Sequence, residues 1–175
     1  MADAWEVIES TTLSGTSTGV TFSSLTTDYV HLMVKMTVRT DLNTTPGHDY
    51  VGIHFNGDTA GNYGTTAGTG ANTTLGVEEE AANVNGMKVR ATACDPENAL
   101  MFGQIEVVIP SYQSTNQNGC CFGNGGKAGT SYGFDQFGGG YWDNTAAITS
   151  VTLNPGGGTN FNIGSTFTIY GLRSS

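Results

Sequence analysis

The stretch Tyr29–Arg39, YVHLMVKMTVR, decides the fold class of this chain. Every second residue in it is apolar, and the apolar set is Val30, Leu32, Val34, Met36 and Val38. A period of two places alternate side chains on opposite faces of a β-strand, whereas a helix requires spacings of three and four. The stretch therefore predicts a long strand with one face on a hydrophobic core.

The same alternation predicts further strands on both sides of this one. They are expected at Ala4–Ser10, Val20–Phe22, Tyr50–Phe55, Met87–Ala93, Ala99–Ile109, Ala147–Leu153 and Phe161–Tyr170. In the last of these, one face is expected to carry Phe161, Ile163, Phe167 and Ile169 toward the core. A turn or two of helix is expected only in Gly76–Ala82, which contains three consecutive glutamates.

Two segments between these strands are predicted to be long loops, Gly57–Gly86 and Tyr112–Asn144. Loops longer than about 12–15 residues are uncommon unless they are functional or disordered. The second segment interleaves aromatic residues with glycine, so it is expected to pack on its own domain, a neighbouring subunit or a ligand. Aromatic residues often dominate interfaces, and the candidate interface residues are Trp5, Tyr132, Phe134, Phe137, Tyr141 and Trp142. For Trp5, burial in the core of its own domain is the alternative.

About eight strands with abundant turn residues predict an all-β, antiparallel β-sandwich. We expect a jelly roll, with an immunoglobulin-like sandwich as the second topology. The chain has 175 residues, which suits one domain. Residues 1–175 are therefore taken as a single domain, in which residues 1–10 form either an N-terminal arm or the first strand.

Composition and charge exclude several classes of protein. Charged residues make up 12% of the chain and aromatic residues 10%, which is unlike a disordered protein. The formal net charge is −9, and the six Lys and Arg residues form no run, so a nucleic-acid partner is not expected. No apolar stretch approaches the roughly 20 residues that a membrane-spanning helix needs, and the N-terminal residues do not resemble a signal peptide. We expect a protein made in a cytoplasm, with no membrane partner.

No arrangement of residues predicts an active site. The histidines His31, His48 and His54 show none of the spacings of zinc hydrolases. Glu106 is one strand-borne carboxylate, whereas glycoside hydrolysis needs a pair. The chain is therefore expected not to be an enzyme, and no catalytic residue is assigned.

Cofactor and metal motifs are equally weak. Gly125–Ala128 lacks the glycine and the Ser or Thr of a phosphate-binding loop, and is interpreted as a glycine loop with a lysine. Three cysteines, two of them adjacent, fit no zinc or redox spacing and are expected to be free thiols. The turns Asp41–Asn43 and Asn56–Asp58 carry oxygen ligands that suit calcium, but such clusters usually stabilise turns. No cofactor and no metal are assigned.

Several stretches together resemble β-rich virion structural proteins of tailed bacteriophages. They are WEVIESTTLSGT and VTFSSL within Trp5–Leu25, DYVHL at Asp28–Leu32, FNGD at Phe55–Asp58 with the nearby Asn62-Tyr63, VIPSY at Val108–Tyr112, Trp142 with AITSVTL at Ala147–Leu153, and the closing Asn160–Leu172. The resemblance covers most of the chain, and its motifs are turns, strand ends and core aromatics.

The family most similar to the chain is that of the capsid decoration (cement) proteins. This resemblance implies a homotrimeric protein that binds the major capsid protein and stabilises the outer capsid surface of a virion, with no catalytic residue. The alternative that it leaves open is a tip module of a head or tail fibre, which binds a host receptor or a glycan.

Overall fold

The computed structural model describes residues 5–43, 48–71, 74–84, 86–94, 100–128 and 133–173. Regular structure in these ranges is entirely β, as the alternation predicts. The strands are β1 (Trp5–Thr12), β2 (Val20–Phe22), β3 (Tyr29–Thr40), β4 (His48–Phe55), β5 (Tyr63–Ala71), β6 (Thr74–Val84), β7 (Met87–Cys94), β8 (Gly103–Ile109), β9 (Gly119–Ala128), β10 (Gly133–Trp142), β11 (Val151–Pro155) and β12 (Thr166–Arg173).

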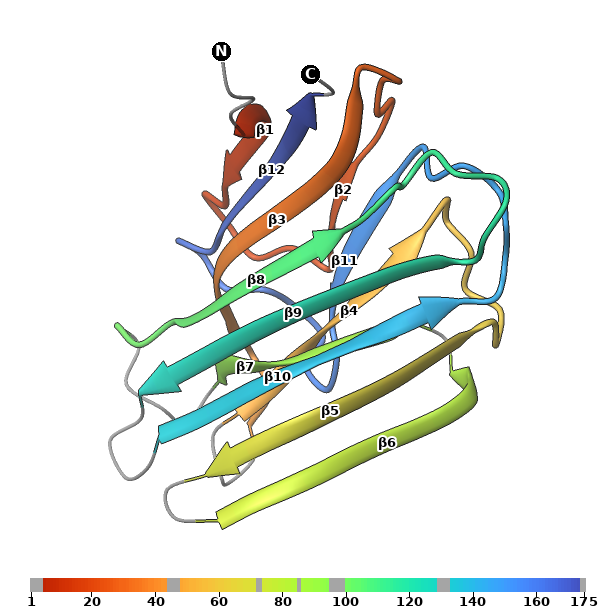
Figure 1. Ribbon diagram of the computed structural model, residues 1–175. Coiled ribbons are helices and arrows are strands. Elements are labelled where there is room, and N and C mark those ends of the chain that lie inside the picture. The colour runs from red at the N-terminus through yellow and green to blue at the C-terminus, as the bar shows by residue number, and fades with distance from the viewer. Residues whose placement is uncertain are drawn as a thin grey trace.

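The strands form two layers (Figure 1), and strand β3 belongs to one layer and pairs with the other. The front layer is a large sheet in the order β1-β12-β3-β8-β9-β10-β5-β6, with every pair antiparallel. The back layer has the order β2-β11-β4-β7 and is also antiparallel. The far end of β3 joins the layers through a short parallel pairing of Arg39 and Thr40 with Ala93 and Cys94. The predicted antiparallel, sandwich-like all-β fold is confirmed, with this one parallel pair as an exception.

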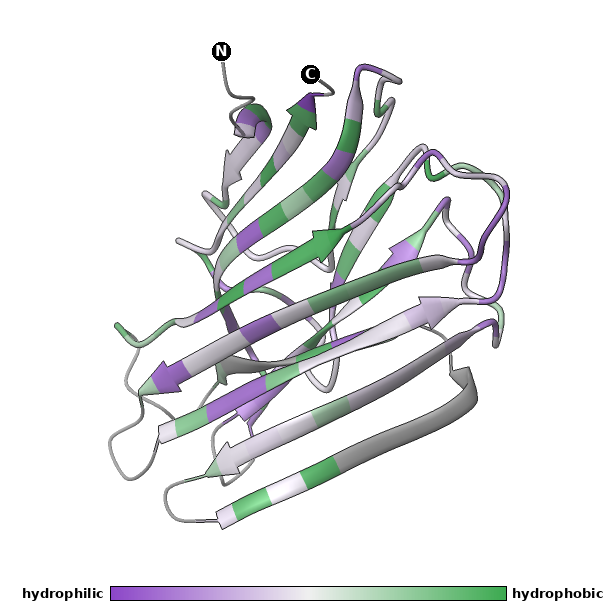
Figure 2. Cartoon of the chain, viewed as in Figure 1, coloured by the Kyte–Doolittle hydropathy of each residue, from purple (hydrophilic) through white to green (hydrophobic). Residues whose placement is uncertain are grey.

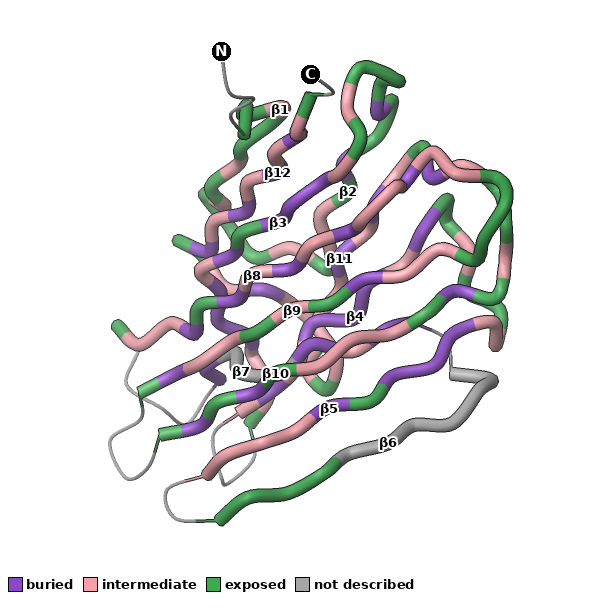
Figure 3. Tube along the Cα trace, viewed as in Figure 1, coloured by how far each residue is buried: buried purple, intermediate pink, exposed green. Residues whose placement is uncertain are grey.

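The hydrophobic core lies between the layers. Figure 2 shows apolar and polar bands alternating along β3 and β8, and Figure 3 shows buried positions separated by less buried ones along β8 and the middle of β3. From β3 the core receives Leu32, Val34, Met36 and Val38, four of the five apolar residues of the opening stretch; the fifth, Val30, remains partly exposed near the start of the strand. Strand β7 packs across the back of β8, β9 and β10, so the core continues beneath the part of the sheet that the alternation did not predict.

The predicted strands are found, with shifts at their ends. Val20–Phe22 agrees at both ends, and β1 pairs with β12, so residues 5–10 form a first strand rather than an arm. The last strand begins only at Thr166, because Gly164 has a positive φ of 86° and interrupts the chain before it. Ile163 is consequently 61% exposed instead of facing the core.

The prediction of two long loops is wrong, and so is the prediction of helix in Gly76–Ala82. Most of Gly57–Gly86 is the antiparallel pair β5–β6, and most of Tyr112–Asn144 is the antiparallel pair β9–β10. These four strands extend the large sheet beyond β8, where β10 pairs with β5. The segment Gly125–Ala128 is part of β9 rather than a loop.

The remaining eight strands divide evenly between the layers. Without the two inserted pairs, the front sheet has the order β1-β12-β3-β8 and the back sheet keeps the order β2-β11-β4-β7. A double sheet of eight strands is the architecture of a jelly roll. The jelly-roll topology itself stays a prediction.

Candidate interaction surface

Strand β10 carries most of the residues predicted to form an interface, and its alternation separates them into two groups. Phe137 and Tyr141 lie on the outer face of the large sheet and are 71% and 41% exposed. Phe134 and Trp142 lie on the inner face and are buried, which corrects their assignment as interface residues. Tyr132 lies outside the described residues.

The two inward aromatics are held by contacts within the domain. Phe134 stacks on His48, with ring centroids 4.3 Å apart. Trp142 stacks on Tyr63, and its indole Nε1–H donates a hydrogen bond of 2.8 Å to a carboxylate oxygen of Asp58. These rings therefore fix the β10 extension on the core and do not contribute to a surface.

Trp5 lies at the opposite edge of the large sheet. It is the first residue of β1, pairs with Leu172 of β12, and remains 37% exposed. Val7, two residues on, is more exposed still. Burial of Trp5 in the domain core, the alternative reading of this residue, is therefore not found.

Cross-strand register brings exposed apolar side chains together on the outer face of the inserted strands. We call this group the outer apolar face, and it consists of Leu75 and Val77 on β6, Phe122 on β9, and Phe137 and Tyr141 on β10. The start of β6 is exposed in Figure 3 and carries apolar bands in Figure 2. A β-strand at a sheet edge with exposed apolar side chains is a typical site of association with another protein.

Glycines on β5 set the shape of this face. Gly68 pairs with both Phe137 of β10 and Val77 of β6, and Gly64 pairs with Tyr141. A Cβ added at Gly68 would lie 2.5 Å from Cζ of Phe137, and one at Gly64 would lie 2.5 Å from Cε1 of Tyr141. The aromatic rings thus lie over bare backbone, and this arrangement holds them close to the sheet.

Sequence reasoning missed Leu75, Val77 and Phe122 because their segments were taken as loops. The alternation Leu75-Gly76-Val77 is a strand signal of only three residues, and the acidic run that follows it obscures the pattern. Phe122 lies between Cys121 and Gly123 in a segment whose glycines weaken any strand prediction.

The acidic turns considered for calcium are occupied by hydrogen bonds within the chain. Asp41 accepts hydrogen bonds from the backbone N–H groups of Thr159 and Asn160 and from the Asn160 side chain. Burial opposes ionisation, but these donors together lower the pKa of Asp41. The carboxylate therefore fastens the turn before β12 to the end of β3, which is the turn role that the sequence favoured.

Asp58 acts in the same way at the other turn. It accepts hydrogen bonds from the side chains of Asn62 and Trp142 and from the backbone N–H of Ala60. These donors, above all the Asn62 amide, lower its pKa. Within the described ranges, no three His, Cys, Asp or Glu side chains are grouped so as to hold a metal ion.

Other residues that were considered for catalysis make contacts within the domain. His31 accepts a hydrogen bond at Nδ1 from the backbone N–H of Ser111, and Glu106 pairs with Lys35 at 3.0 Å. The cysteines are free thiols, as predicted. Cys121 is buried beside the sulfur of Met87, and burial raises its pKa to about 12, so it is a poor nucleophile.

No family model matches the chain, and neither the curated proteins nor the solved structures contain a significant match. In the part of the chain that the structure describes, no helix has the length and hydropathy needed to cross a membrane.

Proposed function

We propose that this chain is a phage virion structural protein, a capsid decoration protein that binds capsid subunits and stabilises the outer capsid surface. The observation that carries the proposal is the outer apolar face. Its five side chains are between 41% and 89% exposed, and apolar side chains exposed in a contiguous group usually mark a surface that another protein covers. The sequence resemblance to virion proteins supports the same conclusion.

Charge indicates which partner covers this face. The chain has a net charge of −9, and Glu78, Glu79 and Glu80 follow Val77 on the same strand. Pairing two copies of this face would bring two such acidic strand segments close together, and repulsion between like charges opposes that pairing. The face therefore suits a different protein, the capsid subunit, with an apolar patch bordered by neutral or basic residues.

Copies of the chain would meet elsewhere, in a homotrimer. The edge strand β1 exposes Trp5 and Val7, and tryptophan is common among the residues that dominate protein interfaces. In this proposal Trp5 keeps the interface role that the sequence suggested. The trimer presents three outer apolar faces to the capsid, and their combined binding is stronger than that of one.

The fold proposed for this role is a jelly roll with two inserted strand pairs. Its support is the strand order: eight strands form two antiparallel sheets of four, and β5–β6 and β9–β10 enlarge one sheet at its β8 edge. The insertions supply all five side chains of the outer apolar face. The sandwich is thus the rigid base, and the insertions are the binding element.

The test is capture by capsid shells prepared without this chain from the phage that encodes it. The wild-type chain should be captured stoichiometrically, and the shells should gain resistance to heat. The double variant Leu75→Ser/Val77→Thr should bind at least about tenfold more weakly, a loss of about 1.4 kcal/mol. These side chains are 89% and 81% exposed, so the fold should be unaffected.

The matched control is Thr21→Ala/Thr152→Ala, which removes an exposed hydroxyl pair on the back sheet. It should be captured like the wild type. Absence of capture of the wild-type chain, or equal capture of the Leu75/Val77 variant, would reject the proposal. Light scattering tests the trimer separately: the wild type should have three times the chain mass of 18.2 kDa, and Trp5→Ser/Val7→Thr should be monomeric.

A further inference from the structure

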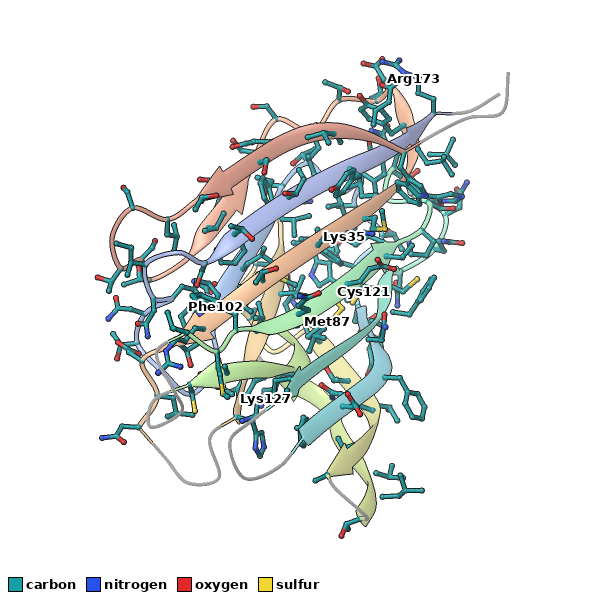
Figure 4. All side chains as sticks on the ribbon, turned by 90° about the vertical axis from the view of Figure 1, so that its left-hand side faces the viewer. Lys35, Met87, Phe102, Cys121, Lys127 and Arg173 are labelled. Carbon is teal, nitrogen blue, oxygen red and sulfur yellow. The ribbon has the colours of Figure 1, made fainter. Side chains whose placement is uncertain are left out.

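A groove crosses the outer face of the large sheet next to the outer apolar face. It has a volume of about 1070 Å³ and spans five neighbouring strands, β12, β3, β8, β9 and β10. In Figure 4 these strands run side by side across the view, with Lys35 on β3 and Phe102 just before β8. Phe137 is the one residue that the groove shares with the outer apolar face; the function proposed above assigns no role to the rest of the groove.

Two ladders of residues form its floor, and each strand contributes one residue to each ladder. Cross-strand pairing aligns the first ladder as Thr168, Lys35, Glu106, Asn124 and Phe137. It aligns the second ladder, two residues along each strand, as Thr166, Thr37, Gln104, Gly126 and Asp135. Five strands span about 19 Å at a spacing of about 4.8 Å. The groove therefore accommodates an extended molecule rather than a single small ring.

A glycine in the second ladder leaves room for the carboxylate of its neighbour on β10. Gly126 lies between Gln104 and Asp135, and a Cβ at this position would be 2.6 Å from the carboxylate oxygen of Asp135. A side chain here would displace the Asp135 carboxylate and project into the groove. Phe102 borders the groove at the start of β8 and Phe137 borders it on β10.

Polar groups in the groove are available to a ligand. Among the described residues, the side chains of Gln104, Asn124 and Asp135 make no hydrogen bond, and all three residues are exposed. Lys35 and Glu106 neutralise each other at 3.0 Å. Lys127, which is buried, also lines the groove, so its two cationic and two anionic side chains balance. The groove thus offers amides, hydroxyls and the exposed carboxylate of Asp135, with no excess of positive charge.

We propose that this groove binds a neutral oligosaccharide, a function beyond the capsid binding proposed above. Sugar hydroxyls both donate and accept hydrogen bonds, so they match amides, threonine hydroxyls and a carboxylate. The rings of Phe102 and Phe137 supply apolar surfaces for the C–H faces of sugar rings. The carboxylate of Asp135, together with the net charge of −9, disfavours acidic sugars.

The position of the groove disfavours an extended peptide. Peptides that bind sheets usually add a strand at an edge, where backbone N–H and C=O groups are unpaired. The groove lies over strands that have neighbours on both sides, so their backbone groups are already paired. A ligand here must be recognised through side chains alone, which suits a polyhydroxylated chain.

The experiment is a titration of the ¹⁵N-labelled full chain with neutral oligosaccharides of glucose, mannose and galactose, followed by calorimetry of any that bind. At least one should shift the amide signals of the groove ladders, and oligogalacturonate, an acidic comparator, should not. Binding of none of the neutral sugars, binding of the acidic one alone, or shifts outside the groove would overturn the inference.

Variants locate the site. Gly126→Thr fills the groove and should weaken binding at least about tenfold; the atom that it approaches is the end of a flexible side chain, so the fold should tolerate it. Gln104→Ala/Asn124→Ala should weaken binding without filling the groove, and Thr21→Ala/Thr152→Ala is the control. Sugar binding that survives both groove variants would contradict the assignment.

The variants distinguish failure of the sugar-binding proposal from failure of the capsid-binding proposal. The Gly126 variant should still be captured by capsid shells, because Gly126 lies outside the outer apolar face. The Leu75→Ser/Val77→Thr variant should still bind sugar. Loss of capsid capture in the Gly126 variant would mean that the groove is part of the protein interface instead.

Discussion

At the scale of single residues, glycines on the inner face of β10 let the inserted strands lie against the core. A Cβ at Gly140 would be 2.6 Å from Cγ of Met87 and 2.6 Å from the carbonyl oxygen of Gly64. A Cβ at Gly138 would be 2.7 Å from Cα of Ala67. Backbone atoms cannot move aside as the end of a side chain can, so these positions require glycine.

We expect Gly140→Val to destabilise the fold by about 1–3 kcal/mol, the usual cost of overpacking a core. Urea unfolding followed by tryptophan fluorescence measures this change, since Trp142 is two residues away on the same strand. Gly15→Ala is the control, because nothing lies within 4 Å of a Cβ there. Equal unfolding midpoints for the two variants would show that β10 does not pack on β7 as described.

The hydrogen bonds to Asp58 predict how the stability of the folded protein depends on pH. Its folded-state pKa is lowered by hydrogen bonds from Asn62, Trp142 and Ala60. A lowered pKa stabilises the folded state above the unfolded pKa of about 4. That contribution is lost as the pH falls through the folded pKa, when the carboxylate is protonated.

The variant Asp58→Asn should therefore be less stable at neutral pH and should lose less stability on acidification than the wild type. Urea unfolding at a series of acid pH values measures both effects. Asn62→Ala, which removes one donor, should show a smaller change in the same direction. If Asp58→Asn lost as much stability on acidification as the wild type, other carboxylates would account for the acid dependence.

At the scale of elements, the inserted pairs β5–β6 and β9–β10 depend on aromatic side chains of one strand covering glycines of the next. Phe137 covers Gly68 and Tyr141 covers Gly64. A glycine in a strand lacks a side chain to pack, and cross-strand pairs are the unit of sheet stability. The aromatic rings thus replace the missing side chains while they build the outer apolar face.

We expect Phe137→Ala to destabilise the sheet by about 0.5–1 kcal/mol, within the range of one cross-strand pair. Gly68→Ala alone should also destabilise it, because the new Cβ displaces the ring. In the Phe137→Ala background, however, Gly68→Ala should be stabilising, because alanine suits a strand better than glycine. A double-mutant cycle by urea unfolding measures this reversal of sign, and additive effects would contradict the ring's position over Gly68.

At the scale of the whole molecule, the pairings join strands that are distant along the chain. Strand β1 pairs with β12 and β2 pairs with β11, so the first and last strands lie side by side, as Figure 1 shows. Closing such long segments costs chain entropy before the contacts can compensate for it. The topology therefore favours slow folding, in the range of milliseconds to seconds or longer.

Stopped-flow refolding, followed by tryptophan fluorescence, tests this expectation. A double-jump experiment separates the rate set by topology from proline isomerisation, which takes tens of seconds. Burial of Trp142 should coincide with the main phase, because β10 needs β5, β9 and β7 in place. Complete burial in less than a millisecond would show that the inserted pairs form locally, ahead of the sandwich.

The sequence determined the all-β class and the strands of the sandwich. The alternation in Tyr29–Arg39 is a local property, and it specifies a half-buried strand whichever strand pairs with it. The sequence did not reveal the inserted pairs, since Gly138 and Gly140 remove the apolar side chains by which a strand face is recognised. Only the tertiary structure decided that Phe134 and Trp142 are core residues and that Phe137 and Tyr141 are exposed. The physical reason is that a residue's face depends on how β10 pairs with β5 and β9 over the core, and β5 lies dozens of residues away in the chain.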